Sequence, residues 1–241
     1  MHSRHSFDGK YLMSSFDLKK YISHLPSQNN IPCCAASSSL KAAEIIMASA
    51  GNTIRFSRLF TFYMARKMAN KLTQDGLSIK ETLDSMMYYG VATDDTWPFY
   101  IDRVNKEPND KSKDEALNCK LDSYEYLSPE NFNNFLRQEI PIIVGIQTGR
   151  MYWKLKGTFD KQFYKPINTT DNLKHRDHAV TIIGYDDTIL GGSWIVANSH
   201  GLLWGDHGLG IFPYECAQDI GESYAITEFA GISPGKKISE N

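Results

Sequence analysis

The chain has 241 residues, and its 26 Lys and Arg nearly balance its 28 Asp and Glu, so the net charge is −2. This balance argues against a nucleic-acid partner held by phosphate neutralisation, and the apolar stretches, such as 140–146, are far shorter than the roughly 18 residues of a membrane span. Hydrophobic residues make up 41% and charged residues 22%, which excludes a disordered chain, and four cysteines are too few for a disulfide-built scaffold.

Helical signals dominate the first half of the chain. Ala36, Leu40, Ala43 and Met47 recur at the spacing of one helix face. Ser57 and Ser78 are expected to cap the next two helices, and Ser78 begins a capping-box sequence. The charged segment 102–118 is expected to be a loop that crosses between the two halves. The expected helices, in chain order, cover residues 34–50, 57–68, 78–89 and 128–138.

Short apolar runs rich in branched residues predict strands in the second half. A polar, glycine-rich turn region joins two of these runs, and the last ten residues are expected to fray. The expected strands cover residues 141–148, 178–185, 193–198, 208–214 and 224–230. Helices followed by strands predict an α+β fold. We expect a single domain over 1–241, with a helical lobe over about 28–115 and a β lobe over about 116–232.

Three residues far apart in the sequence are candidates for nucleophilic catalysis. Cys34 stands at the start of the first expected helix, where the partial positive charge of the helix end favours a thiolate. His178 opens one expected strand and Asn198 ends the next. Neighbouring antiparallel strands would bring both to one end of the sheet, where the asparagine oxygen could accept the imidazole proton in a hydrogen bond. A nucleophile, a base and a group that orients the base form the logic of a triad.

With these residues identified, the sequence resembles the papain-like cysteine peptidases over most of the chain. The segment 28–34, with Gln28 six residues before Cys34 and a helix after it, is similar to the family's nucleophile segment. Segments 178–186 and 198–208 resemble the histidine strand and the asparagine motif with its tryptophan loop. Segments 75–78 and 89–98 are similar to the helical lobe of microbial members. The resemblance implies the two-lobe fold, with the active site in the cleft between the lobes.

The resemblance also implies a role for each matched position. Cys34 would be the nucleophile, His178 its ion-pair partner and later the proton donor to the leaving amine, and Asn198 would orient His178. The side-chain amide of Gln28 and the backbone N–H of Cys34 would form the oxyanion hole, where each donor is worth about 2.7–4 kcal/mol. No cofactor or metal is implied. Substrate-binding positions are expected at Gly76, Leu77, Asp177, His200 and Trp204.

Some positions depart from the family pattern. Ile31 replaces a disulfide cysteine, and Pro32–Cys33 stand where the family has Gly–Ser. Leu77 occupies the position of the second glycine of the substrate-binding pair. His200 stands where a tryptophan usually covers the Asn–His contact. Because an imidazole can titrate near neutral pH, His200 is expected to weaken the pair or make activity pH-sensitive.

Several alternatives remain open at this point. Cys33 could be the nucleophile, or Cys33 and Cys34 could form a strained vicinal disulfide. His175 and His178, beside Asp177, could suggest zinc, although no matching pair lies nearby in the sequence. The same thiol chemistry could serve isopeptide cleavage or amide transfer. A catalytically inactive papain-like binding module is the alternative from another class.

The leading expectation is a monomeric cysteine peptidase that acts on a protein or peptide substrate, with no nucleic-acid partner. The first residues lack the apolar core of a signal peptide, so either the protein is not exported or a leader is absent from this chain and the protein is secreted. Residues 1–20 are a candidate for a short autoinhibitory strap. Whether Cys119 and Cys216 form a disulfide is left open.

Overall fold

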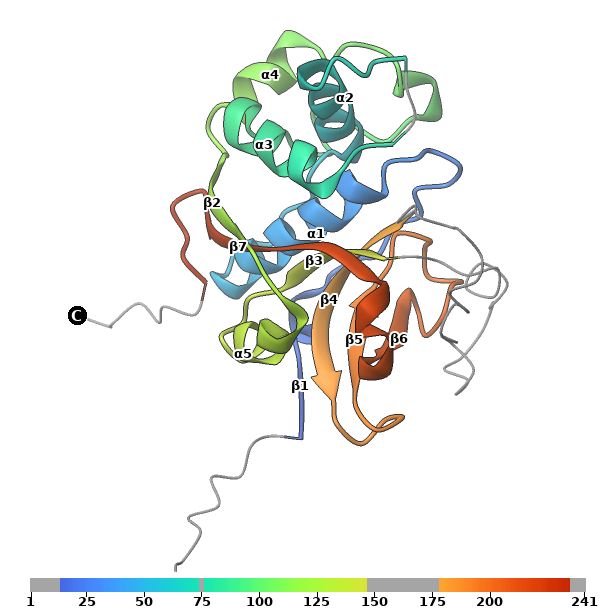
Figure 1. Ribbon diagram of the computed structural model, residues 1–241. Coiled ribbons are helices and arrows are strands. Elements are labelled where there is room, and N and C mark those ends of the chain that lie inside the picture. Colours follow the sequence, from blue (N-terminus) through green and yellow to red (C-terminus); the bar gives the residue numbers. More distant parts are fainter. Residues whose placement is uncertain (1–13, 74–75, 147–177, 235–241) are drawn as a thin grey trace, which may run out of the picture.

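A computed structural model of the protein describes residues 14–73, 76–146 and 178–234. Within them, helices and a large antiparallel sheet confirm the α+β class. Figure 1 shows three helices gathered on one side of the molecule, the sheet on the other, and the longest helix between them. Those helices are α2 (Arg58–Met68), α3 (Ile79–Tyr89) and α4 (Asp110–Ala116), with α1 (Cys34–Ser49) in the middle.

The helix starts follow from local hydrogen bonds. The Ser57 hydroxyl accepts a hydrogen bond from the Phe60 N–H at 3.1 Å and so caps α2. Ser78 and Glu81 complete a reciprocal capping box at the start of α3. These two helices therefore begin where the sequence predicts. The fourth expected helix is shorter and splits into a 3-10 turn, Pro129–Asn131, and α5 (Phe132–Arg137).

The sheet of the described residues has seven strands, and all its pairings are antiparallel. Its order is β2-β7-β3-β4-β5-β6, with β1 paired to β4 as well. Gly184 of β4 permits that extra pairing, because a Cβ there would lie 2.4 Å from the Phe16 carbonyl oxygen. The strands are β1 (Ser15–Asp17), β2 (Leu121–Tyr126), β3 (Ile142–Ile146), β4 (His178–Asp186), β5 (Ser193–Ala197), β6 (Leu209–Pro213) and β7 (Ile220–Phe229).

Other elements also differ from the expectations. The charged segment 102–118 is not a loop throughout, because it contains the short helix α4, which Asn109 caps through the Ser112 N–H at 2.8 Å. Strands β1 and β2 were not predicted, since neither has a continuous apolar run. Strand β7 begins at Ile220, earlier than the predicted 224. The lobe boundaries at 115 and 116 stay a prediction.

The N-terminal segment belongs to the sheet from residue 15 onward. Leu18 is fully buried in a core cluster with Ile183, Ile195 and Ile211. Removing residues 1–20 would therefore remove a strand and a core side chain, so only the part before residue 14 remains a candidate strap. In the described part of the chain, no helix is both long and apolar enough to cross a membrane.

Candidate functional site

The two adjacent cysteines at the start of α1 have different surroundings. Cys33 is the N-cap residue, is fully buried, and lies 3.7 Å from the Ser37 hydroxyl through its Sγ. Burial raises the pKa of the Cys33 thiol to about 11. Cys34, the first residue of α1, is partly exposed and lines a cleft. The thiol that a substrate can reach is therefore that of Cys34.

None of the four cysteines is part of a disulfide bond in the structure. Cys33 and Cys34 therefore do not form a vicinal disulfide here. Cys119 and Cys216 are not bonded to each other either, and burial raises the pKa of both thiols.

Strand pairing brings His178 and Asn198 together. His178 is the first residue of β4, and Asn198 directly follows β5, which pairs with β4 from Thr181 opposite Ala197 onward. The His178 Nε2 lies 2.8 Å from the Asn198 Oδ1, and both side chains are at least 96% buried. The same amide oxygen accepts the Ser199 N–H at 2.8 Å. The imidazole is thus held in one orientation from the Nε2 side.

Gln28 lies beside these residues and is held on both sides of its amide. Its Nε2 donates to the Ile31 carbonyl at 2.8 Å, and its Oε1 accepts a hydrogen bond from the Ser199 hydroxyl. Its backbone N–H donates to the Ser199 carbonyl at 2.7 Å. A side-chain amide carries two N–H donors, so a second N–H can serve a substrate oxygen while the first holds Ile31.

Cys34, His178 and Gln28 line one open cleft with a volume of about 580 Å³. Gly76 and Leu77 form part of its wall, and Gly76 has a left-handed backbone with φ of 81°, which favours glycine. The cleft is large enough for several residues of an extended peptide. The remaining wall residues are Asn29, Asn30, Ile31, Pro32, Ile79, Gly145, Ala179, His200 and Glu222.

The His200 ring lies between the rings of His178 and Trp204 and contacts both. The His200 ring lies 4.9 Å from the His178 ring and 6.0 Å from the Trp204 ring, each in an edge-to-face arrangement. Burial lowers the pKa of His200. His200 lines the cleft, whereas Trp204 is almost fully buried and packs under His200 in the core. Asp177 lies outside the described residues.

Glu222 is a cleft residue that sequence reasoning missed. It comes from β7, yet its carboxylate accepts the backbone N–H groups of Ile79 at 2.8 Å and Lys80 at 3.4 Å, at the start of α3. A carboxylate at a helix N-terminus is favourable because of the helix dipole. The capping box at Ser78 marks the start of the helix in the sequence, but nothing local relates it to a residue in the last strand.

Among the described residues, no group of three or more His, Cys, Asp and Glu side chains is placed to hold a metal ion. His175 and Asp177, the other members of the zinc alternative, lie outside those residues.

One family model and several known proteins match this chain. The family model described as papain family cysteine protease matches residues 12–224. Vignain of Phaseolus vulgaris is 32% identical over 124 residues, 49% of this chain and 31% of vignain, so the match spans about a third of that relative. An uncharacterized peptidase C1-like protein of Acanthamoeba polyphaga mimivirus is 25% identical over 230 residues, 87% of this chain and 72% of that protein.

Solved structures show the same fold. Xylellain, a cysteine protease from Xylella fastidiosa, superposes with a TM-score of 0.76 at 22% identity, over 88% of this chain and 85% of that one. Digestive procathepsin L 3 of the Tenebrio molitor larval midgut superposes with a TM-score of 0.66 at 19% identity, over 90% and 71%. At these identities the likeness speaks to the fold alone, which is the two-lobe fold expected from the sequence.

Proposed function

Since the chain belongs to the papain family of cysteine proteases, we propose that it is a cysteine peptidase that cleaves peptide bonds through a thioester on Cys34. The observation that carries this proposal is that Cys34, His178 and Gln28 line the same open cleft. The cleft can hold an extended protein or peptide segment, which is the proposed substrate. Export and a monomeric state stay predictions.

In the proposed reaction, His178 takes the proton of the Cys34 thiol, and the thiolate attacks the peptide carbonyl carbon. The carbonyl oxygen becomes an oxyanion, which the Gln28 amide and the Cys34 backbone N–H stabilise. The carbon–nitrogen bond then breaks as His178 protonates the leaving amine. Water, deprotonated by His178, attacks the thioester. The second tetrahedral intermediate collapses by breaking the carbon–sulfur bond, which releases the acid product, and His178 returns the proton to the Cys34 sulfur.

Asn198 supports both proton transfers. Its oxygen accepts a hydrogen bond from Nε2–H of His178, so the other ring nitrogen, Nδ1, is the one that exchanges a proton with Cys34. The imidazolium form donates the same bond more strongly, because hydrogen bonds to charged groups are stronger than neutral ones. We therefore assign Asn198 the role of orienting His178.

Substrate contacts are proposed along the walls of the cleft. The backbone of Gly76, beside Leu77, can approach an extended peptide because Gly76 carries no side chain and leaves open space at its Cβ position. Leu77 then offers an apolar contact where a second glycine would offer backbone alone. His200 borders the leaving-group side next to His178, and Trp204 acts through His200.

A peptide-library assay tests the proposal. Wild type should cleave peptides, a cysteine-directed epoxide should abolish cleavage, and Cys34→Ala should be inactive while Cys33→Ala, the matched control, keeps activity. Iodoacetamide should label Cys34 and leave the buried Cys33 unlabelled. Cleavage by Cys34→Ala, or label on Cys33 alone, would contradict the assignment.

The same assay should include isopeptide substrates and amine acceptors, since a thioester can also pass to an amine. Turnover only on those substrates would point to isopeptide cleavage or amide transfer instead. If wild type cleaves nothing in any arm, the chain is an inactive binding module.

A further inference from the structure

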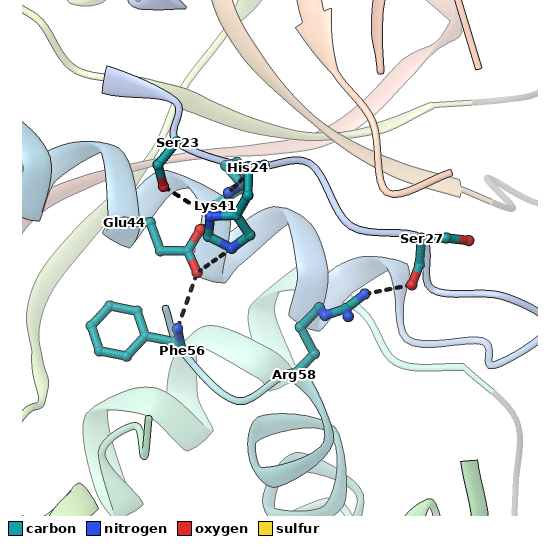
Figure 2. Close-up of polar contacts among 7 residues, drawn as sticks. All are labelled: Ser23, His24, Ser27, Lys41, Glu44, Phe56 and Arg58. Carbon is teal, nitrogen blue, oxygen red and sulfur yellow. Dashed lines mark hydrogen bonds and ion pairs between the residues drawn. The ribbon is translucent and has the colours of Figure 1, made fainter. Parts of the chain in front are cut away.

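A cluster of charged side chains lies between α1, the start of α2 and strands β4 and β5. It borders a cavity of about 90 Å³ that Asn198 and Ser199 also line. Figure 2 shows His24, Lys41, Glu44 and Arg58 of this cluster, with the His24 ring facing Glu44 and Arg58 reaching toward Ser27. The catalytic steps proposed above use none of these charges. The charged or titratable wall residues are His24, Lys41, Glu44, Arg55, Arg58 and Asp94.

Two cations of this cluster hold the backbone of the segment that leads to Gln28. The Lys41 Nζ donates to the His24 carbonyl at 2.7 Å, and the Arg58 Nη1 donates to the Ser27 carbonyl at 2.9 Å. Lys41 belongs to α1 and Arg58 to α2, so both donors come from helices. The segment is thus tied to the helices directly before it reaches Gln28.

The contact of Arg58 falls on the peptide unit that joins Ser27 to Gln28. The carbonyl of that unit accepts from Arg58, and its N–H donates to the Ser199 carbonyl at 2.7 Å. A trans peptide unit is planar, with its C=O and N–H pointing in opposite directions. Arg58 of α2 therefore holds the carbonyl side of this planar peptide unit, and Ser199, in the loop after β5, holds its N–H side. Its orientation sets where the Gln28 side chain begins.

The position of Arg58 is unfavourable for stability taken alone. It is the first residue of α2, where the helix dipole disfavours a cation, and burial lowers its pKa. The side chain gains the Ser27 bond and a stacking contact with the Phe99 ring, whose centroid lies 3.9 Å from Cζ. An apolar residue could pack at this place without the cost of burying a charge. The contact to Ser27 is what an apolar residue could not supply.

We propose that Arg58 is a positioning residue for the oxyanion hole, which holds the Ser27–Gln28 peptide unit so that the Gln28 amide faces the substrate oxygen. This inference rests on the proposed function, in which Gln28 stabilises the oxyanion. Lys41 supports the same segment at the His24 carbonyl, before the chain reaches Ser27. Arg58 itself touches no reacting atom.

The test compares Arg58→Met with Arg55→Met, which removes a neighbouring, exposed cation of the same cavity that makes no hydrogen bond to residues 24–28. Deleting an oxyanion donor costs about a hundredfold or more in kcat, so loosening one should cost about tenfold. We expect Arg58→Met to lower kcat by about that factor with little change in KM, and Arg55→Met to leave both unchanged. Arg58→Lys, which keeps a donor, should recover part of the loss. Thermal unfolding of each variant shows that the assays use folded protein.

Two readouts separate positioning from a general structural effect. A peptide aldehyde forms a tetrahedral adduct whose oxygen occupies the oxyanion hole. Arg58→Met should therefore weaken the binding of the aldehyde by about the same factor by which it lowers kcat. Alkylation of Cys34 by iodoacetamide forms no oxyanion, so its rate and pH profile should stay within about twofold of wild type. In a Gln28→Ala background, Arg58→Met should cause no further loss, because residues that act together are non-additive.

The outcomes distinguish this inference from the proposed function. If Gln28→Ala is as active as wild type, or wild type cleaves no peptide, the proposed role of Gln28 fails and the inference falls with it. If Gln28→Ala is impaired but Arg58→Met is not, only the inference is overturned. The inference is also overturned if Arg58→Met lowers kcat by the same factor in the wild-type and Gln28→Ala backgrounds. It is likewise overturned if Arg58→Met slows the alkylation of Cys34 by iodoacetamide as much as it slows turnover.

Discussion

The imidazole Nε2 of His178 lies 2.8 Å from the side-chain oxygen of Asn198, across two neighbouring antiparallel strands. Both residues lie at the same end of the sheet, because His178 is at the beginning of β4 and Asn198 is just past the end of the antiparallel strand β5. The paired strands therefore hold the base, while α1 presents Cys34 to the cleft that His178 also lines. The cleft therefore lies between the N-terminus of α1, which carries Cys34, and the start of β4, which carries His178.

Asn198→Ala should lower kcat/KM without abolishing activity. The lost bond holds a base that becomes charged during the reaction, and such bonds are worth about 1.5–3 kcal/mol, or roughly ten- to 150-fold in rate. Steady-state kinetics on a cleaved peptide measure the loss, and Asn198→Asp, which keeps the acceptor, is the control. Unchanged kcat/KM in Asn198→Ala would show that the pair does not orient the base.

His200→Trp should keep activity near neutral pH and extend it toward acid. Burial lowers the pKa of His200, so its ring is neutral at pH 7 and becomes charged only at acidic pH. Once charged, it would repel the His178 imidazolium that pairs with the Cys34 thiolate, because the two rings lie 4.9 Å apart. Tryptophan removes that titration, so the acidic limb of the kcat/KM profile should move to lower pH. Complete loss of activity, or an unmoved acidic limb, would contradict this role.

Lys41→Met should destabilise the protein strongly. The Lys41 and Glu44 side chains are each 9% exposed and form an ion pair, so Lys41→Met would leave the Glu44 carboxylate buried without that cation. Removing one member of a buried pair costs about 3–5 kcal/mol of unfolding free energy. Lys80→Met breaks an exposed pair with Asp84 and serves as the control, which should change stability little. Denaturant unfolding measures both, and equal midpoints for the two variants would refute the argument.

The stability of the protein should fall on acidification partly because of His24. Burial, and then the charges of Lys41, Arg55 and Arg58, lower the His24 pKa to about 3, although Glu44 lies 3.6 Å from its Nε2. Lys41 already neutralises that carboxylate, so the cations prevail. Between about pH 6.5 and 3 the unfolded chain binds a proton that the folded one does not, so stability decreases as the pH falls through this range.

A His24→Gln variant, which cannot titrate, should therefore lose less stability than wild type between pH 7.5 and pH 4.5. The comparison is the shift of the urea midpoint between the two pH values. The exposed His207→Gln is the control and should behave like wild type. If His24→Gln and wild type lose stability in parallel, His24 is not the group responsible.

Much of the candidate site was predicted because its signals are local. Ser57 and Ser78 each accept from an N–H only three residues ahead, so the starts of α2 and α3 are visible in a few letters. The strands that hold His178 and Asn198 are continuous buried runs, which short apolar segments reveal. Strands β1 and β2 escaped prediction because their burial is mixed and their partners are far away in sequence.

The sequence by itself determined the start of α1 at Cys34 and the apolar strands that begin at His178 and lead to Asn198, since each signal lies in neighbouring residues. Only the tertiary structure decided that Cys33 is buried while Cys34 lines the cleft. It also decided that Glu222 caps α3 and that Arg58 holds the Ser27 carbonyl. Such contacts join groups from separate elements, and their energy depends on burial and orientation, which no local pattern of residues records.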